Sequence, residues 1–278
     1  MSIIENKVID GKGLSEKFIR EVRDKVITKN ELKGLAIILI GNDPSSQLYV
    51  KLKNRACENC GIPFHQYCFD KEAKEEDILA SIDFLNNDPE TAGILIQLPL
   101  PEKFDTDKII SAMDYRKDID GFHPKNRKNM EACNFHVLPP LPLGIVEMVN
   151  ATGEKIEDKN IVILCNHKLF GDPFKCVWGE KNQIDIITMD DADWKDKVAE
   201  ADVLIVSIGL PYFIDKDMIK EGSIVIDVGI NKLEDGEIVG DVNFADVIDK
   251  VGFISPVPGG VGPMTIAMLL KNLLKIQE

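Results

Sequence analysis

The fold is decided by Ala36-Ile37-Ile38-Leu39-Ile40 and by the residues that follow it, Gly41-Asn42-Asp43-Pro44. Five consecutive apolar residues predict a strand that is buried on both faces, and the next four residues are typical of a turn. The sequence then predicts a helix from about Ser45 to Asn59, closed by Gly61. A buried strand that leads into a helix in this way favours a parallel sheet covered by helices.

The alternation of strands and helices continues towards the C-terminus. Further strands are predicted at Gln66–Phe69 and Gly93–Gln97, with an amphipathic helix between them over Lys74–Asn87. The prolines of Leu98-Pro99-Leu100-Pro101 end the last of these strands. These elements make up a first α/β unit.

A second α/β unit begins near Ile161. Its predicted strands, with helices between them, are Ile161–Leu164, Ile184–Thr188, Val203–Ile208 and Ile224–Val228. The segment Asn231–Asp241 predicts a hairpin, and Leu143–Asn150 predicts a helix that connects the two units. Ligands of parallel sheets bind beyond the carboxyl ends of the strands, so we expect an α/β protein of two domains with a ligand cleft between them.

Composition restricts the class of protein. The chain has 278 residues, of which 44% are hydrophobic and 29% charged, which is typical of a globular protein with two domains. No apolar run approaches the length of a membrane span and the N-terminus carries no targeting pattern, so we expect a cytoplasmic protein without a membrane partner. The net charge of −14 argues against a nucleic-acid partner.

The cysteines give no signal for a metal. The chain has six, and only Cys57-x-x-Cys60 has a metal-like spacing. No second pair of ligands completes that motif, so we expect no metal and interpret both residues as reduced thiols on a helix.

The segment Ser255-Pro256-Val257-Pro258-Gly259-Gly260-Val261-Gly262-Pro263-Met264-Thr265 precedes an apolar helix. Its glycines let a ligand approach the main chain closely, and Pro263 and Thr265 suit a helix start, where free N–H groups favour an acceptor. We interpret it as a loop that contacts a ligand. A stiff surface loop before a terminal helix is the alternative.

Four polar residues of the first unit are candidates for chemistry. Tyr49 and Lys53 are one helical turn apart, so they share a face near the end of the first strand. Gln97 ends a buried strand, and Asp120 lies in the tight turn Lys117-Asp118-Ile119-Asp120-Gly121, where it can reach a ring with an amidine-like N–H edge. A solvated helix face and an Asx turn are the alternatives.

The second unit is expected to bind a dinucleotide, although its first turn lacks G-x-G-x-x-G. The turn is Cys165-Asn166-His167-Lys168-Leu169-Phe170-Gly171, with a single glycine. The second strand ends at Asp190-Asp191, where a carboxylate can hold a ribose 2′-hydroxyl and repel a 2′-phosphate. Gly209 and Ile230 follow the third and fourth strands, where backbone amides can meet a nicotinamide.

Together these residues resemble the bifunctional methylenetetrahydrofolate dehydrogenase/methenyltetrahydrofolate cyclohydrolase family, also called the FolD family. The resemblance covers nearly the whole chain in order. It is carried by Ser46-x-x-Tyr49-Val50-x-x-Lys53, Gly93-x-x-x-Gln97-Leu98-Pro99-Leu100-Pro101, Lys117-Asp118-Ile119-Asp120-Gly121, Val225-Ile226-Asp227-Val228-Gly229-Ile230-Asn231, Gly240-Asp241-Val242 and Pro256–Thr265.

The resemblance implies a fold and an activity. It implies a folate-binding catalytic domain over residues 1–138, to which a helix at 266–278 returns, a Rossmann-like NAD(P)-binding domain over 139–265, and a homodimer. The implied reactions are oxidation of 5,10-methylenetetrahydrofolate to the methenyl form and its hydrolysis to 10-formyltetrahydrofolate. Both belong to the one-carbon metabolism that supplies purine biosynthesis.

The resemblance also implies residue roles. Lys53 is the expected catalytic lysine and Gln97 its hydrogen-bonding partner, while Tyr49 stacks on the aminobenzoyl ring and Asp120 binds the pterin. Further substrate contacts are expected at Pro258, Gly259, Gly260, Val261, Gly262, Pro263 and Thr265. The expected cofactor-binding positions are Cys165, Asn166, His167, Gly171, Asp190, Gly209 and Ile230.

The chain departs from the family at the cofactor turn. Cys165-Asn166-His167 stands where the family usually has Gly-Arg-Ser, so the residues associated with the NADP phosphate are missing. Family habit favours NADP, whereas Asp190 and Asp191 favour NAD. Two other functions stay open: a cyclohydrolase with weak or lost dehydrogenase activity, and a non-catalytic folate- or nucleotide-binding module.

Overall fold

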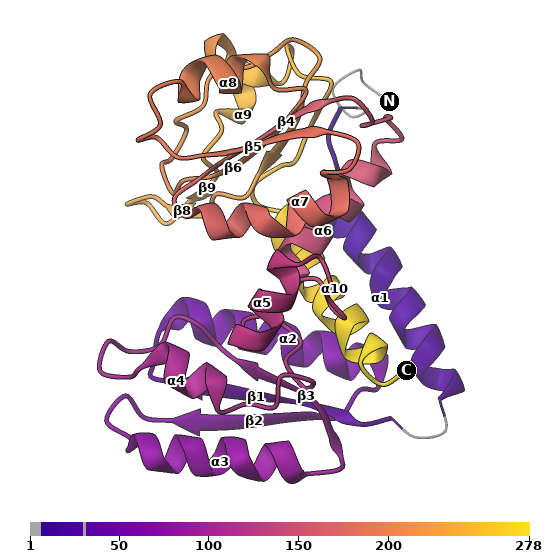
Figure 1. Cartoon of the computed structure of the whole chain (residues 1–278), viewed down its shortest axis with the longest axis vertical. Coiled ribbons are helices and arrows are strands. Elements are labelled where there is room, and N and C mark those ends of the chain that lie inside the picture. Colours follow the sequence, from indigo (N-terminus) through magenta and orange to yellow (C-terminus); the bar gives the residue numbers. More distant parts are fainter. Residues whose placement is uncertain (1–6, 30–31) are drawn as a thin grey trace. The chain divides into compact units, whose positions relative to one another are not determined.

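The computed structural model describes residues 7–29 and 32–278 (Figure 1). The chain divides into two compact units, named here by their sheets. The three-stranded unit comprises Glu16–Pro140 and Ile266–Glu278, and the five-stranded unit comprises Leu141–Thr265 with the described residues before Glu16. The described N-terminal residues, predicted within domain 1–138, therefore group with the later part of the chain. They are joined to it by long-range backbone pairing, since the N–H of Ile9 donates to the carbonyl of Ile254 at 2.8 Å.

The three-stranded unit has a parallel sheet in the order β2-β1-β3. Its strands are β1 (Gly34–Ile40), β2 (Phe64–Phe69) and β3 (Thr91–Ile96). The helices lying wholly in this unit are α2 (Pro44–Cys60), α3 (Glu75–Asn87), α4 (Thr106–Ser111) and α5 (Pro124–Glu131). The parallel, helix-covered sheet predicted from the sequence is confirmed.

Helix α2 starts immediately after β1 because its ends are capped. The carboxylate of Asp43 accepts a hydrogen bond from the N–H of Ser46 at 2.7 Å, and Pro44 occupies the first turn. The helix ends at Gly61, whose φ of 72° is left-handed and whose N–H reaches back to the last turn. Cys57 and Cys60 are buried, free thiols on this helix, as predicted, and burial raises the pKa of Cys57 to about 12.

Alternate residues of the fully buried β1 pack into two different cores. Ile37 and Leu39 face a cluster that includes α2 and the C-terminal helix α10 (Val261–Lys275). Ile38 and Ile40 face a cluster with α3 and α4. Apolar contacts therefore hold α2 on one face of the sheet and α3 on the other, which fixes both helices relative to the strand ends.

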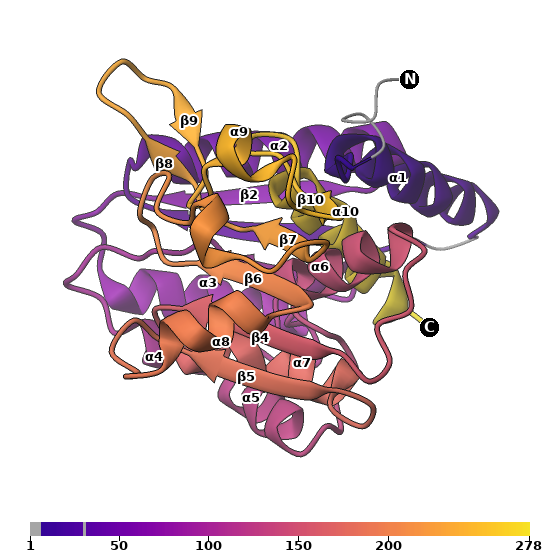
Figure 2. The same ribbon diagram turned by 90° about the horizontal axis from the view of Figure 1, so that it is seen from above.

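The five-stranded unit has a parallel sheet in the order β10-β7-β6-β4-β5 (Figure 2). Its strands are β4 (Asn160–Cys165), β5 (Gln183–Ile187), β6 (Val203–Ser207), β7 (Ile224–Asp227) and β10 (Phe253–Ile254). Strand β5 pairs with one edge of β4, and the chain then crosses over to form β6 at the other edge of β4. The carboxyl ends of β4 and β6 therefore flank the topological switch point, where sheets of this kind bind ligands.

The helices between these strands are short. They are η1 (Lys168–Gly171), α7 (Asp172–Trp178), α8 (Trp194–Glu200), η2 (Lys216–Met218) and α9 (Phe244–Val247). The helix expected between β6 and β7 is only the 3₁₀ turn η2, which is capped by the Asp215 carboxylate that accepts from the N–H of Asp217. The predicted hairpin forms from β8 (Asn231–Lys232) and β9 (Ile238–Val239).

The chain passes from one unit to the other within three helices. They are α1 (Gly11–Thr28), α6 (Pro140–Ala151) and α10. The C-terminal helix, expected to begin at 266, begins at Val261, because Pro263 needs no hydrogen bond in a first turn. Across residues 7–29 and 32–278, no helix is long and apolar enough to cross a membrane.

Candidate active site

Lys53 and Gln97 form the centre of the site in the three-stranded unit. The Lys53 ammonium donates a hydrogen bond to Oε1 of Gln97 at 2.9 Å, and only 8% of Lys53 is exposed. Gln97 is held at the end of β3, because its N–H donates to the carbonyl of Ile38 and its Nε2 donates to the carbonyl of Leu98. The amide oxygen is therefore aimed at the amine, and the expected pairing of these two residues is present.

The environment of Lys53 lowers the pKa of its amine. Burial disfavours the charged ammonium, and the carboxylate of Asp120 opposes that effect by stabilising it. Tyr49 lies one turn before Lys53 on α2 and is half-buried, and burial raises the pKa of its hydroxyl. The site thus combines a tyrosine whose hydroxyl has a raised pKa with a lysine whose amine has a lowered pKa.

Asp118 builds the turn that carries Asp120. Its buried carboxylate accepts hydrogen bonds from the N–H groups of Asp120, Gly121 and His123 at 3.2, 3.0 and 2.8 Å. The side-chain amide of Asn126 donates to the same carboxylate at 2.9 Å. The Asx-turn interpretation therefore applies to Asp118, and Asp120 remains available to a ligand.

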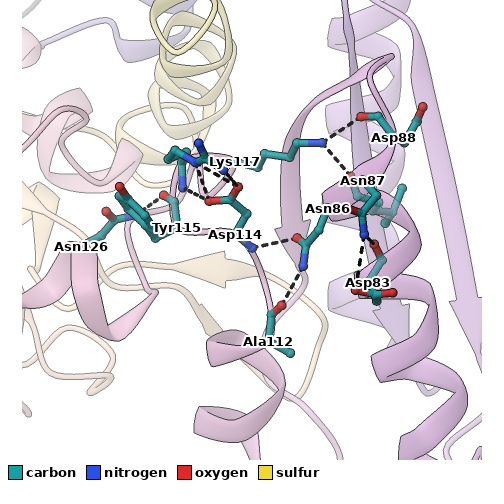
Figure 3. A network of polar contacts seen from close by, with 11 residues as sticks. Asp83, Asn86, Asn87, Asp88, Ala112, Asp114, Tyr115, Lys117 and Asn126 are labelled. Atoms are coloured by element: carbon teal, nitrogen blue, oxygen red, sulfur yellow. Dashed lines mark hydrogen bonds and ion pairs between the residues drawn. The ribbon is translucent and has the colours of Figure 1, made fainter.

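A wider polar network anchors this turn to α3 (Figure 3). The Lys117 ammonium donates to the carbonyls of Leu85 and Asp88 at 2.7 and 2.8 Å. Asn86 of α3 bridges the same region, accepting from the N–H of Asp114 and donating to the carbonyl of Ala112. Lys117 thus has a structural role, and its hydrogen bonds fix the position of the turn against α3.

Asp120 is the second charged group of this site. Burial raises its pKa to about 6, the ammonium of Lys53 opposes that rise, and the nearby Asp118 adds to it. Near neutral pH the unit therefore combines a carboxylate with an amine of lowered pKa. That arrangement suits proton transfer and the binding of a ring with donor groups.

The segment Ser255–Gly260 of the five-stranded unit is held by its neighbours. The N–H of Asp227 donates to Ser255 Oγ at 2.8 Å, and the N–H of Lys12 donates to the carbonyl of Gly259 at 2.9 Å. Gly259 has a φ of +105° with open space beside it, so its backbone is accessible. Pro258 is exposed, whereas Gly260 and Val261 are buried.

The remaining residues expected to bind substrate lie at the start of α10. Gly262, Pro263 and Thr265 are half-buried, and Thr265 Oγ1 donates to the carbonyl of Val261 at 3.1 Å. That hydroxyl is therefore used within the helix.

The side chains of the turn after β4 do not all face solvent, as cofactor-binding side chains would. Cys165 is buried, and its thiol donates to the carbonyls of His167 and Ile187 at 3.4 and 3.9 Å, so its side chain points inward. Asn166 and His167 are exposed. The Asn166 amide donates to the carbonyl of Ile208 at 2.9 Å, across the switch point.

Gly171 is required by packing. A Cβ at this position would overlap the side chain of Ile186 on β5. The glycine therefore lets the chain entering α7 approach the sheet closely, which is the role of the last glycine in a dinucleotide-binding turn.

The acidic pair after β5 divides into two roles. Asp191 accepts a hydrogen bond from the N–H of Thr188 at 2.7 Å and pairs with Lys168 at 3.1 Å. The bond from Thr188 is the main reason that the pKa of Asp191 is lowered. Asp190 is exposed and makes no ion pair within the described part of the chain.

Two further expected positions, Gly209 and Ile230, are exposed at the carboxyl ends of β6 and β7. Gly209 has a φ of +70° with open space beside it, and 57% of Ile230 is exposed. Exposed backbone at the switch point and an exposed apolar side chain beyond the neighbouring strand fit a dinucleotide.

Sequence reasoning assigned no role to two buried carboxylates, Asp227 and Asp241. Asp241 accepts from the N–H groups of Ile208, Gly209 and Leu210, the segment that follows β6. The signal is present in the sequence as Asp227-Val228-Gly229 and Gly240-Asp241-Val242, in which each aspartate has a glycine within two residues.

Two family models match the chain. Residues 9–120 match the tetrahydrofolate dehydrogenase/cyclohydrolase catalytic domain, and residues 139–278 match the tetrahydrofolate dehydrogenase/cyclohydrolase NAD(P)-binding domain. A bifunctional protein FolD of Aliarcobacter butzleri is 40% identical over 276 residues, which cover 98% of this chain and 96% of the relative.

Solved structures agree with these matches. The bifunctional enzyme FolD, a methylenetetrahydrofolate dehydrogenase/cyclohydrolase of Campylobacter jejuni, is 40% identical with a TM-score of 0.92, covering 97% of each chain. The methylenetetrahydrofolate dehydrogenase-cyclohydrolase of Trypanosoma brucei, solved with NADP and an inhibitor, is 29% identical with a TM-score of 0.90. The match covers 97% of this chain and 96% of the Trypanosoma brucei chain.

Proposed function

The chain belongs to the tetrahydrofolate dehydrogenase/cyclohydrolase family, and from this membership we propose how its own residues carry out the two reactions. It is an enzyme that oxidises 5,10-methylenetetrahydrofolate to 5,10-methenyltetrahydrofolate with NAD(P)⁺ and hydrolyses the product to 10-formyltetrahydrofolate. The roles of single residues, the choice between NAD and NADP, and a homodimeric state are parts of the proposal.

The single observation that carries the proposal is the hydrogen bond between Lys53 and Gln97. It aims a buried amine of lowered pKa at one point, next to a carboxylate that can hold a pterin. A purely structural lysine gains little from burial beside an amide oxygen, because desolvation of its charge is costly. A non-catalytic folate- or nucleotide-binding module does not need this pair.

In the oxidation the residues of this chain act mainly by placement. The nicotinamide, when bound, accepts a hydride from the methylene carbon, and a ring nitrogen of the folate supplies the electron pair. No acid or base is required for that step, so orientation is the main demand. Tyr49 would stack on the aminobenzoyl ring, and Asp120 would accept hydrogen bonds from the pterin.

In the hydrolysis Lys53 would take the active part. The methenyl carbon is cationic, and water must add to it and lose a proton before the ring opens. The amine of Lys53 would accept that proton and return one to the leaving ring nitrogen. Gln97 would keep the amine in line through the 2.9 Å hydrogen bond.

We propose that NAD⁺ is the preferred oxidant. Asn166 stands where the family usually carries arginine, and its amide is already used by the carbonyl of Ile208. Lys168 is paired with Asp191, while the exposed carboxylate of Asp190 lies after β5, where it suits a ribose 2′-hydroxyl and repels a phosphate.

The deciding experiment follows absorbance of the purified protein with 5,10-methylenetetrahydrofolate, in parallel with NAD⁺ and NADP⁺. Hydrolysis of added methenyltetrahydrofolate is measured in the same preparation. We expect both activities and a higher kcat/KM with NAD⁺. Hydrolysis without reduction of either nucleotide would instead identify a cyclohydrolase that has lost the hydride step. Size-exclusion chromatography with light scattering tests the proposed homodimer.

A further inference from the structure

Asp241 lies at the centre of a backbone cradle in the five-stranded unit. Its carboxylate is fully buried and accepts four hydrogen bonds. Three come from consecutive N–H groups, those of Ile208, Gly209 and Leu210, at 2.7, 3.0 and 2.9 Å. The fourth comes from the side-chain amide of Asn231 at 2.8 Å.

No cation pairs with Asp241 among the residues that the structure describes. Three successive amides that converge on one anion form a nest, a geometry that proteins commonly use to bind anionic ligands. Here the anion belongs to the protein, so the nest is filled from within. The carboxylate therefore acts on the backbone of residues 208–210 and does not face a ligand.

The cradle is itself held by Asp227. One carboxylate oxygen of Asp227 accepts from the N–H groups of Gly229 and Asp241 at 2.9 and 3.0 Å. The other oxygen accepts from the N–H of Val242 at 2.9 Å. Asp227 thus fixes the main chain that carries Asp241, and the two carboxylates form one interlocked pair.

Two glycines make this pair possible. A Cβ at Gly229 would overlap the carboxylate of Asp241, and a Cβ at Gly240 would overlap that of Asp227. Each aspartate therefore occupies space that a side chain on the opposite glycine would need. The carboxylates can therefore occupy these positions only because residues 229 and 240 are glycines.

The segment that the cradle fixes lies at the switch point of the sheet. The N–H of Ile208 is held by Asp241 and its carbonyl by Asn166, so both of its polar backbone groups are taken. The next residue, Gly209, has a left-handed φ of +70° with open space beside it, and 38% of Leu210 is exposed. An internal anion therefore sets the shape of an exposed backbone segment.

We propose that Asp241 is a positioning residue for the nicotinamide nucleotide: it shapes residues 208–210 to receive the nucleotide, without touching it. The proposal rests on the proposed function, because it needs residues 208–210 to contact the cofactor. It adds a residue that acts on cofactor binding and not on the folate chemistry of Lys53.

The test uses Asp241→Asn in the full-length enzyme. The asparagine keeps the shape and one acceptor oxygen but turns an N–H₂ group towards the backbone donors. We expect the KM for the nucleotide, and the Kd of the nucleotide alone by calorimetry, to rise about tenfold or more, in keeping with the loss of a buried charged acceptor. The cyclohydrolase kcat/KM should stay within about twofold of wild type.

Asp246→Asn is the matched control. Asp246 also accepts a backbone hydrogen bond in this unit, from the N–H of Lys216 at 2.9 Å, and it pairs with the ammonium of Lys216 at 3.4 Å, so its hydrogen bond and ion pair go to Lys216 and not to residues 208–210. Its nucleotide Kd should match wild type. A parallel fall in both activities of Asp241→Asn, with an unchanged Kd, would show a merely structural role and overturn the proposal.

A second variant covers the case in which Asp241→Asn fails to fold. Asn231→Ala removes one of the four donors and leaves the carboxylate in place, so a smaller rise in nucleotide Kd, about threefold, is expected with cyclohydrolase activity retained. An unchanged Kd in that folded variant contradicts the proposal. Absence of nucleotide reduction by the wild-type enzyme would be a failure of the proposed function, which is a separate result.

Discussion

The amine of Lys53 and the amide oxygen of Gln97 lie 2.9 Å apart, although 44 positions separate the two residues in the chain. One comes from the third turn of α2 and the other from the residue after β3. Both elements flank β1, whose two faces hold α2 and α3 in place. The contact is therefore fixed by the sheet and by the helix packed against it.

Lys53→Met should separate the two activities. The methionine keeps much of the apolar side chain but cannot transfer a proton, so we expect hydrolysis of methenyltetrahydrofolate to fall at least about 100-fold, the usual contribution of a general acid or base. The oxidation should fall less than about tenfold, since it depends on placement. Parallel assays of the two steps give the answer, and equal loss of both in a folded variant would contradict the roles proposed.

Gln97→Ala tests whether the amide positions the amine. Removal of the acceptor leaves a buried amine with a lost partner, so hydrolysis should fall by about tenfold, from a hydrogen-bond loss of about 1 to 2 kcal/mol. The kcat is expected to carry the change, with KM for the folate nearly unaltered. A change confined to KM would assign Gln97 to substrate binding instead.

The charge of Asp120 should set the pH dependence of Lys53. A carboxylate stabilises the ammonium, so Asp120→Asn should lower the pKa of Lys53 further and move the rising limb of kcat for hydrolysis to lower pH. The effect should be present only above a pH of about 6, where Asp120 is ionised. Asp107→Asn, which removes an equal charge at an exposed position, should leave the profile in place. A coincident profile for Asp120→Asn and wild type would refute the coupling.

Asp190 should control the choice of nucleotide. Asp190→Ser removes an exposed carboxylate at the end of β5, so kcat/KM with NADP⁺ should rise about tenfold relative to NAD⁺, equivalent to about 1.4 kcal/mol. Asp196→Ser, an equal change of charge at an exposed position of α8, should leave the ratio unaltered. The ratio is measured at constant ionic strength, and no change in Asp190→Ser would remove this residue from the nucleotide site.

Gly171→Ala should destabilise the protein. The added methyl group would collide with Ile186 on β5, and overpacking of this kind costs about 1 to 3 kcal/mol. Lys175→Ala on neighbouring α7 breaks only an exposed ion pair and should cost less than about 0.5 kcal/mol. Urea unfolding compares the two, and an unaltered midpoint for Gly171→Ala would mean that the turn yields.

Much of the fold is visible in the sequence because buried strands are continuous apolar runs. Strands β1 to β7, the end of α2 at Gly61 and the hairpin at Asp235-Gly236 all follow from local patterns, whereas the two-residue strand β10 was not predicted. Helix α1 lies outside the predicted elements, although Phe18, Val22 and Val26 recur every four residues and carry its signal. The short η2 shows the opposite error, since alternation alone predicts a full helix there.

The candidate site could be predicted only where residues act through their own side chains. Lys53 and Gln97 were both identifiable, but the hydrogen bond that joins them depends on tertiary structure. Two features of the turn after β4 were not predictable, because they depend on the neighbouring strands β5 and β6. The thiol of Cys165 points inward, and the side-chain amide of Asn166 donates to the carbonyl of Ile208. The same holds for Asp241, whose three backbone donors lie 31 to 33 positions away.

The glycine–carboxylate pairs have a consequence for redesign of the nucleotide site. Each carboxylate occupies the space that a side chain at a glycine would need, and each also accepts backbone hydrogen bonds. Exchange of one residue alone would therefore cause a collision or leave an N–H group without an acceptor; this holds for Gly229, Gly240, Asp227 and Asp241. They behave as a single module of four positions. A graft of this pocket onto another scaffold would need all four together, and libraries that vary exposed residues such as Leu210 and Ile230 around a constant module should keep the most folded members.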